Sequence, residues 1–304
     1  MSNSNQPLAP EDYVEPTCLL CGEPYGAEPM IRAVPQQRII QKMDEYMSRR
    51  DYAGAERHLL YWMEEAKLGQ DRRGQLMLSN ELIGHYRKTG DRDKALRWAD
   101  EALGLLEKLD FEGSVSAGTT YVNAATACSA FGDNERAFSL FEKARAVYES
   151  GVQVRPELLG GLYNNMALSC KALGRYDEAF ALFDRATEQM GKLPGGALEQ
   201  AITCLNMADA VAAQEGLEAG ETRIFALLDR ALELLQDQAA PRNGYYAFVC
   251  EKCAPSFAYY GYFLAAEELQ KEAARIYESQ RMTSSRRIEK RRRGTFAAPN
   301  ALTQ

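Results

Sequence analysis

The sequence has little of what an enzyme needs. It has only two histidines among 304 residues. Neither His58 nor His85 lies in an H-E-x-x-H metal motif. Nucleophile elbows, phosphate-binding loops and dinucleotide-binding glycine motifs are also missing. We therefore expect that the protein is not an enzyme and that it has no small-molecule substrate.

Long apolar runs are missing as well. No stretch approaches the roughly 18 apolar residues of a membrane span, and residues 1–10 lack the basic start and apolar centre of a secretory signal. We expect a cytoplasmic protein without membrane contact, in which the seven cysteines are reduced. The odd number of cysteines does not indicate a disulfide framework.

The composition is that of an ordinary globular protein. Hydrophobic residues make up 46% of the chain, which is enough for a large core, and the net charge is -7. A negative chain is disfavoured as a nucleic-acid binder when it is taken as a whole.

A repeat of 42 residues runs through the middle of the chain. Residues 121–125 (YVNAA) align with residues 163–167 (YNNMA) at this offset. In one unit, core residues at spacings of three and four predict the buried faces of two helices, and a glycine between them ends the first helix. These residues are Tyr163, Met166, Ala167, Cys170, Gly174, Ala179, Phe183 and Ala186.

This pattern resembles the tetratricopeptide repeat, and the long period with its doubled asparagine resembles the repeats of kinesin light chain. The resemblance covers about residues 36–277. It implies an all-α fold, a right-handed α-α superhelical solenoid of about five to six helical hairpins. It also implies a concave groove that binds a protein or peptide, and hence a non-catalytic adaptor or scaffold.

Asparagine recurs at one position of the first helix in three successive repeats, at Asn123, Asn165 and Asn206. In proteins of this family, that position often hydrogen-bonds the backbone of a bound peptide, and an amide can both donate and accept. The alternative is that these asparagines bond the neighbouring helix and fix the packing of the repeats. The preceding repeat has Glu81 at this position, beside Asn80.

Further residues are expected on the same groove because they lie one or two helical turns from the asparagine position. Their mixed character suggests a peptide of mixed character. They are Thr126, Leu168, Asp209, Lys171 and Lys88.

Two C-x-x-C pairs could supply the four thiolates of a structural zinc site. Cys18 and Cys21 form a knuckle-like pair, whereas Cys250 and Cys253 lie in a predicted helix. About 230 residues separate the pairs, far more than in a standard site. Zinc is therefore a secondary hypothesis, and core packing is the alternative for Cys250 and Cys253.

The two ends differ from the repeats. The density of proline in residues 1–35 predicts a flexible arm, and the solenoid is expected over residues 36–278. Residues 279–304 carry seven basic residues and one acidic residue. We expect a basic, disordered tail there, with association with nucleic acid as the alternative function.

Aromatic residues gather just before this tail. They predict a hydrophobic cap on the last repeat, or alternatively a pocket for an apolar side chain of a partner. The cluster comprises Tyr245, Tyr246, Phe248, Phe257, Tyr259, Tyr260, Tyr262 and Phe263.

Overall fold

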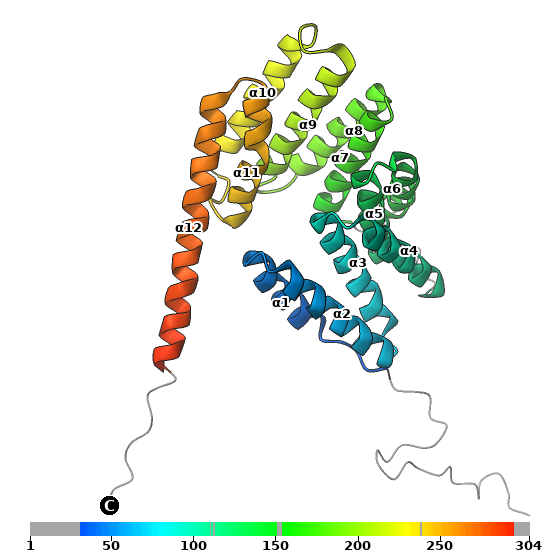
Figure 1. Cartoon of the computed structure of the whole chain (residues 1–304). Helices are drawn as coiled ribbons and strands as arrows, with labels where there is room; N and C mark the ends of the chain where they lie inside the picture. The colour runs from blue at the N-terminus through cyan, green and yellow to red at the C-terminus, as the bar shows by residue number, and fades with distance from the viewer. Residues whose placement is uncertain (1–30, 110, 112, 151–153, 238, 295–304) are drawn as a thin grey trace, which may run out of the picture. The chain divides into compact units, whose positions relative to one another are not determined.

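The structure is a computed structural model that describes residues 31–109, 111, 113–150, 154–237 and 239–294. Within these residues the secondary structure is entirely helical, which confirms the all-α prediction (Figure 1). The helices are α1 (Gln36–Ser48), α2 (Tyr52–Leu68), α3 (Arg72–Thr89), α4 (Arg92–Leu109), α5 (Val115–Ala130), α6 (Asn134–Glu149), α7 (Pro156–Ala172), α8 (Tyr176–Gly191), α9 (Ala197–Glu215), α10 (Glu221–Gln236), α11 (Gly244–Tyr259) and α12 (Phe263–Gly294).

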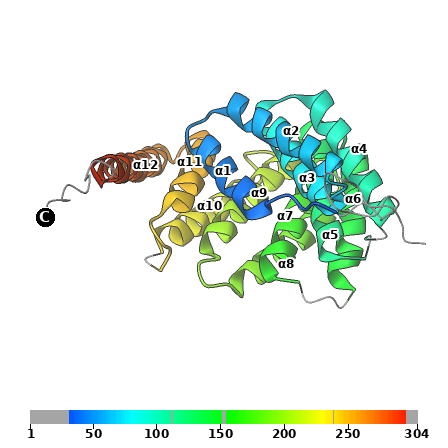
Figure 2. The same cartoon turned by 90° about the horizontal axis from the view of Figure 1, so that it is seen from below.

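Consecutive helices pair into six hairpins, which agrees with the predicted number of repeats. The chain divides into two compact units, unit 1 up to Asp110 and unit 2 from Phe111. In unit 2, α5, α7, α9 and α11 contact one another in turn and form one layer of the solenoid. The even-numbered helices of unit 2 pack on the other side, and α11 and α12 lie side by side (Figures 1 and 2).

Small and large core residues alternate inside each hairpin as the repeat predicts. In the hairpin of α7 and α8, Phe183 is fully buried, and so are the two alanines on either side of it, Ala179 and Ala186. The alanines let the two helices approach closely, and the phenyl ring fills the space beyond them. The hairpin of α5 and α6 repeats this arrangement around Phe141.

The turn between the two helices of a hairpin needs a left-handed residue. Gly174 has φ 73°, which confirms that this glycine terminates the first helix of its hairpin. In the first hairpin the matching position is Arg50, which has φ 56°. A side chain with a Cβ atom is disfavoured in this conformation, so the α1–α2 turn carries backbone strain. The turn between α9 and α10 is longer than these turns.

The last helix differs from the prediction. A disordered tail was expected from residue 279, whereas α12 continues through this region to Gly294. These residues contain no proline and are rich in arginine, which favours helix. Residues 295–304, and residues 1–30 of the arm predicted over residues 1–35, lie outside the described residues.

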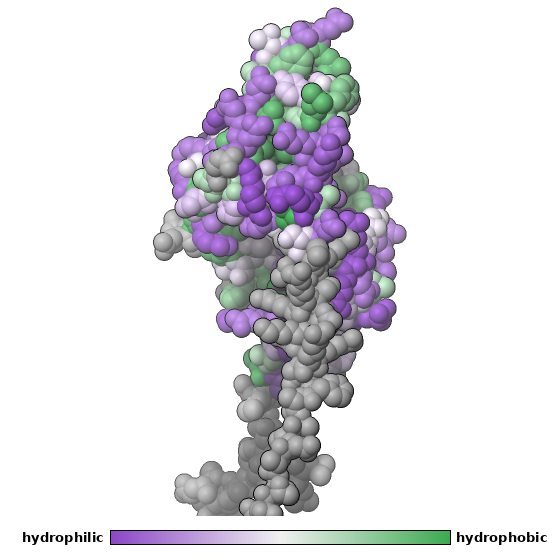
Figure 3. Space-filling model, turned by 90° about the vertical axis from the view of Figure 1, so that its left-hand side faces the viewer, coloured by the Kyte–Doolittle hydropathy of each residue, from purple (hydrophilic) through white to green (hydrophobic). Residues whose placement is uncertain are grey.

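Hydrophilic residues cover most of the described surface on the side of the molecule drawn in Figure 3. Apolar residues gather near the top of that view, at the height of the turn between α9 and α10 (Figure 3). Leu217 in this turn is 53% exposed. None of the described helices is long and apolar enough to cross a membrane.

The two turns make opposite predictions for stability. Left-handed strain at a residue with a Cβ atom costs about 1–2 kcal/mol, and glycine removes it. Glycine also raises the entropy of the unfolded chain, which offsets part of this gain. Arg50→Gly should therefore stabilise unit 1 by roughly 0.5–1 kcal/mol. Gly174→Ala should destabilise unit 2 by about 1 kcal/mol, because alanine is strained in the left-handed conformation. An added Cβ meets no other atom there, so no steric clash adds to this cost. Thermal denaturation of the full-length variants measures both changes. Equal effects of the same sign would contradict the strain argument.

Candidate functional site

The predicted groove residues of unit 2 lie on one layer of helices. We call the partly exposed side of α5, α7, α9 and α11 the odd-helix face. The seven predicted groove residues of unit 2 are all half-buried, at the edge between core and solvent. They are Asn123, Thr126, Asn165, Leu168, Lys171, Asn206 and Asp209.

The asparagines of neighbouring helices have different environments. The Asn206 amide nitrogen on α9 donates to the Asn164 side-chain oxygen on α7 over 2.9 Å, and the Thr203 hydroxyl lies 3.4 Å from the same oxygen. These contacts join two successive repeats, as the packing interpretation expects for Asn206. The half-buried amide of Asn165, in contrast, forms no side-chain hydrogen bond with the described residues.

The surroundings of Asn165 leave room on the odd-helix face. Gly161 lies one turn before Asn165 on α7, and a Cβ atom added to it would meet no other atom within 4 Å. On α5, the Thr126 hydroxyl donates to the Val122 carbonyl over 2.7 Å, so this threonine bonds within its own helix. Open space therefore lies next to the side-chain amide of Asn165.

A shallow groove of about 610 Å³ lies between the carboxyl-terminal ends of α9 and α11. Its lining is mainly apolar and includes Ala212, Pro255 and Tyr259, and Tyr259 is 70% exposed. The Tyr260 hydroxyl donates to the Asp209 carboxylate over 2.8 Å at the edge of the groove. Burial of the hydroxyl and its hydrogen bond to Asp209 both raise the pKa of Tyr260, so the hydroxyl is a donor at neutral pH.

The aromatic cluster divides between the two predicted roles. Tyr246 and Phe257 are buried and help to close the last hairpin, as a hydrophobic cap would. Tyr245 and Phe248 remain about half exposed on α11, where their rings stack with centroids 6.2 Å apart. Pro255 lies inside α11, which continues past it to Tyr259.

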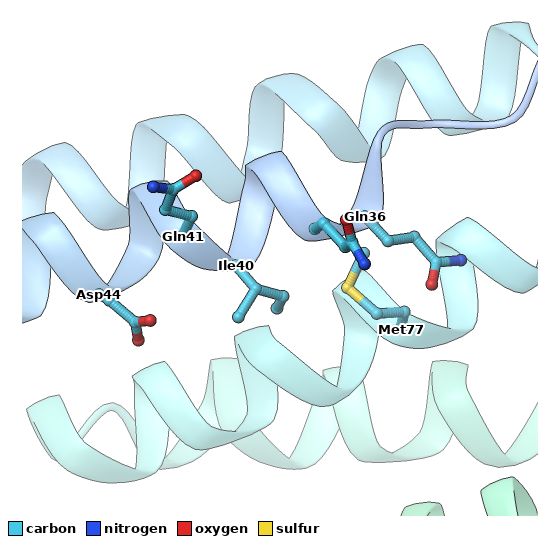
Figure 4. A pocket seen from close by; sticks show the side chains of 6 residues that line it. Gln36, Ile40, Gln41, Asp44 and Met77 are labelled. Carbon is cyan, nitrogen blue, oxygen red and sulfur yellow. The ribbon is translucent and has the colours of Figure 1, made fainter.

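Lys88, the remaining predicted groove residue, lies on α3 in unit 1. Its ammonium lies 5.8 Å from the centroid of the Tyr52 ring on α2. A second groove, of about 450 Å³, lies beside α1 in this unit, and Figure 4 shows its side chains. Glutamines, one carboxylate and two apolar side chains line it, namely Gln36, Gln37, Ile40, Gln41, Asp44 and Met77.

The cysteines of the proposed zinc site do not assemble in the described residues. Cys250 and Cys253 are buried in α11 among hydrophobic residues, which agrees with the packing alternative. Burial raises the pKa of both thiols, that of Cys253 to about 12, so the thiolate form is disfavoured there. No group of three or more His, Cys, Asp or Glu suited to a metal ion occurs in the part of the chain described. Cys18 and Cys21 lie outside it, and zinc binding by them stays a prediction.

Sequence reasoning missed some residues of both grooves. Asn164 stands beside the repeated asparagine and was not assigned as the partner of Asn206. The groove of unit 1 was not predicted, although Glu81 at the asparagine position signalled that this repeat differs from the next three. The aromatic cluster indicated the apolar groove next to Tyr259, but the other wall of this groove depends on how α9 and α11 pack.

Comparisons with known proteins agree with this geometry. The tetratricopeptide repeat family matches residues 75–150 and residues 161–189. The structure of BtubC (BKLC) from P. vanneervenii has a TM-score of 0.56 and 20% identity, covering 66% of this chain and 79% of that one. No curated protein matches the chain significantly in sequence.

Two further solved structures have lower similarity. The nearly identical TPR-like repeats of a Podosopora anserina protein assigned to kinesin light chain have a TM-score of 0.48 and 17% identity, covering 68% of this chain and 96% of that one. A Rap protein complexed with Competence and Sporulation Factor has a TM-score of 0.44 and 14% identity, covering 78% of this chain and 73% of that one.

The helical hairpins, their glycine turns and the family match define an all-helical repeat solenoid of the protein-interaction class. Residues 75–150 and 161–189 match the tetratricopeptide repeat, and the chain resembles tetratricopeptide repeat proteins in fold.

The different environments of Asn165 and Asn206 make a prediction for stability. Asn206→Ala removes an interhelical hydrogen bond and should cost about 1 kcal/mol of unfolding free energy. Asn165→Ala removes no such bond and should change it by less than about 0.5 kcal/mol. Urea denaturation of the full-length variants measures the difference. If Asn165→Ala destabilises as much as Asn206→Ala, then Asn165 has a packing role.

Proposed function

We propose that the protein is a non-catalytic adaptor that binds an extended peptide segment of a partner protein on the odd-helix face of unit 2. The unbonded amide of Asn165 carries this proposal. This half-buried amide has no partner among the described residues, so its donor and its acceptor are available to a ligand. A peptide backbone offers a donor and an acceptor and so satisfies both ends of the amide.

The neighbouring helices support this assignment. Asn123 and Asn206 occupy the same position on α5 and α9, so amides recur along the direction in which the repeats stack. Part of the capacity of Asn206 is used by Asn164, which leaves its own amide oxygen for a ligand. Contacts to the peptide backbone would explain the affinity for a peptide, but they do not select one peptide sequence over another.

The groove between α9 and α11 lies on two of the same helices and adds a site for an apolar side chain. Exposed Tyr259 and Leu217 would be covered by such a side chain, which removes apolar surface from water. We therefore expect the preferred peptide to carry an apolar residue beyond the segment that the asparagines hold.

The open space at Gly161 provides a test that separates binding from folding. Gly161→Leu should not destabilise the protein, because leucine favours helix over glycine by roughly 0.5–1 kcal/mol. The new side chain should nevertheless occupy the odd-helix face. We expect it to weaken, at least 10-fold, the binding of a peptide selected on the wild-type protein from a random-peptide library, measured by fluorescence anisotropy.

Gly104→Leu is the matched control. Gly104 lies on α4, where an added Cβ also meets no other atom within 4 Å. It should change stability in the same direction as Gly161→Leu and leave the peptide affinity unchanged. Selected peptides that bind Gly161→Leu as tightly as the wild-type protein would overturn the proposed binding face.

A further inference from the structure

Unit 1 has an apolar surface on α2 that the described residues do not cover. Three large hydrophobic side chains of this helix are exposed, namely Leu60, Tyr61 and Leu68. Tyr61 is 57% exposed and Leu68 is 71% exposed. Leu68 follows Tyr61 by seven residues, which is about two helical turns, so the two side chains lie on the same side of the helix. Leu60 adjoins Tyr61, and we call these three residues the α2 apolar stripe.

The segment that precedes α1 is bonded to the turn at the end of α2. The Arg32 backbone nitrogen donates to the Gly69 carbonyl over 2.9 Å. The Val34 backbone nitrogen donates to the buried Asp71 carboxylate over 2.9 Å. A Cβ atom on Gly69 would come within 2.5 Å of the Arg32 carbonyl oxygen, so the two segments approach closely. Ile31, the first described residue, is exposed beside this contact.

The order of these two bonds gives the direction in which the chain approaches α2. Arg32 lies opposite Gly69 and Val34 lies opposite Asp71, so both segments run in the same direction. Followed backwards from Arg32, the chain therefore points toward the α2 apolar stripe. Residues 1–30 lie outside the described residues, but the point at which they join the described chain is fixed at one end of the stripe.

The sequence just before this point has large apolar residues within reach of the stripe. Met30 and Tyr25 are the first two that occur in this direction. Tyr25 is seven residues from Arg32, which an extended chain spans in at most about 25 Å. Tyr61 lies about 12 Å from Gly69 along the axis of α2, because eight residues separate them. Both apolar side chains can therefore reach the stripe.

Charge complementarity favours the same occupant. Residues 1–30 contain five acidic residues and no lysine or arginine. Arg57 lies one turn before Tyr61 on α2, is exposed, and forms no ion pair with the described residues. Lys67 on the same helix pairs with Glu64 over 2.9 Å. An acidic segment would neutralise Arg57, whereas a second copy that docked through the same face would bring two Arg57 side chains together.

We propose that residues 23–30 of this chain lie along the α2 apolar stripe and cover it. We call these residues the arm segment. Met30 and Tyr25 supply the apolar contacts, and the acidic residues of the arm segment lie near Arg57. Contact between apolar side chains removes their surface from water. The covalent connection to α1 gives the arm segment a high effective concentration, so a few contacts are enough to hold it.

This contact differs from the function proposed above. The α2 apolar stripe belongs to the second helix of its hairpin and lies in unit 1, whereas the odd-helix face belongs to unit 2. Its occupant is part of the same chain and needs no partner protein. Failure of one proposal therefore leaves the other unaffected.

Hydroxyl-radical oxidation of the full-length protein tests the contact, because the oxidation rate of a side chain increases with its exposure. In Tyr25→Ser/Met30→Ser, Tyr61 and Leu68 should be oxidised roughly 3-fold faster than in the wild-type protein, since the arm segment no longer contacts them. Arg57→Glu should raise the same two rates to a smaller extent, because like charges repel the arm segment. Equal rates in the wild-type protein and in Tyr25→Ser/Met30→Ser would overturn the proposal.

Two controls separate uncovering of the stripe from loss of folding. The oxidation rate of Tyr259, an exposed residue of unit 2, should not change when the arm segment is altered. Phe263→Ser/Leu264→Ser removes two exposed apolar side chains from unit 2 and should leave the oxidation rate of Tyr61 unchanged. Substitutions in the arm segment that accelerate oxidation of Tyr259 as much as that of Tyr61 would indicate unfolding and contradict the proposal.

A second copy of the chain and a separate partner protein are the competing occupants. Cover by the arm segment does not depend on protein concentration, so the oxidation rates of the stripe should stay constant on dilution. Rates that rise on dilution would assign the stripe to a second copy. A stripe that is oxidised in the purified wild-type protein as fast as in the arm-segment variant would be left for a partner protein. Either result would overturn the proposal.

Discussion

The fold depends on close contact between paired helices in each hairpin. Alanines at the points of closest approach allow this contact, and a single phenylalanine fills the remaining space, as Phe183 does between α7 and α8. Two helices packed in this way still leave one face uncovered, and only the next hairpin can bury it. The successive contacts of α6 with α7 and of α8 with α9 supply this cover in unit 2. Stability therefore grows with each added hairpin and needs no central core.

This mode of packing determines where polar groups can stay. Residues that face the partner helix or the next hairpin must be apolar or bonded, as the Asn206–Asn164 contact illustrates. Positions on the odd-helix face are partly exposed to solvent, so a polar amide such as Asn165 can remain there without a partner. The same position holds Glu81 in unit 1, where it creates a negative rather than a neutral surface. One repeated scaffold thus presents surfaces of different charge by changing a single residue for each repeat.

Much of the fold could be predicted because the core residues recur at fixed spacings along the sequence. The positions of Gly174 and Phe183 within the repeat indicate both the turn and the buried stripe. The end of α12 could not be predicted in this way, since charge alone indicated a disordered tail although helix propensity favoured its extension. The continuation of α11 past Pro255 also depends on packing, because neighbouring helices can support a helix that lacks one backbone hydrogen bond.

The candidate site was only partly predictable. Asn123, Asn165 and Asn206 align in sequence, yet nothing in the sequence distinguishes the bonded amide from the free one. That distinction depends on the register between α7 and α9, which places Asn164 rather than Asn165 opposite Asn206.

The central claim is that packing leaves the odd-helix face of unit 2 free to hold a peptide backbone. Nuclear magnetic resonance of the Asn165 side-chain amide tests it most directly, with the signal assigned by its loss in Asn165→Ala. On titration with a library-selected peptide, the account predicts a large shift of this amide signal together with shifts along α5, α7 and α9. Shifts confined to the even-numbered helices, with the Asn165 signal unmoved, would contradict it.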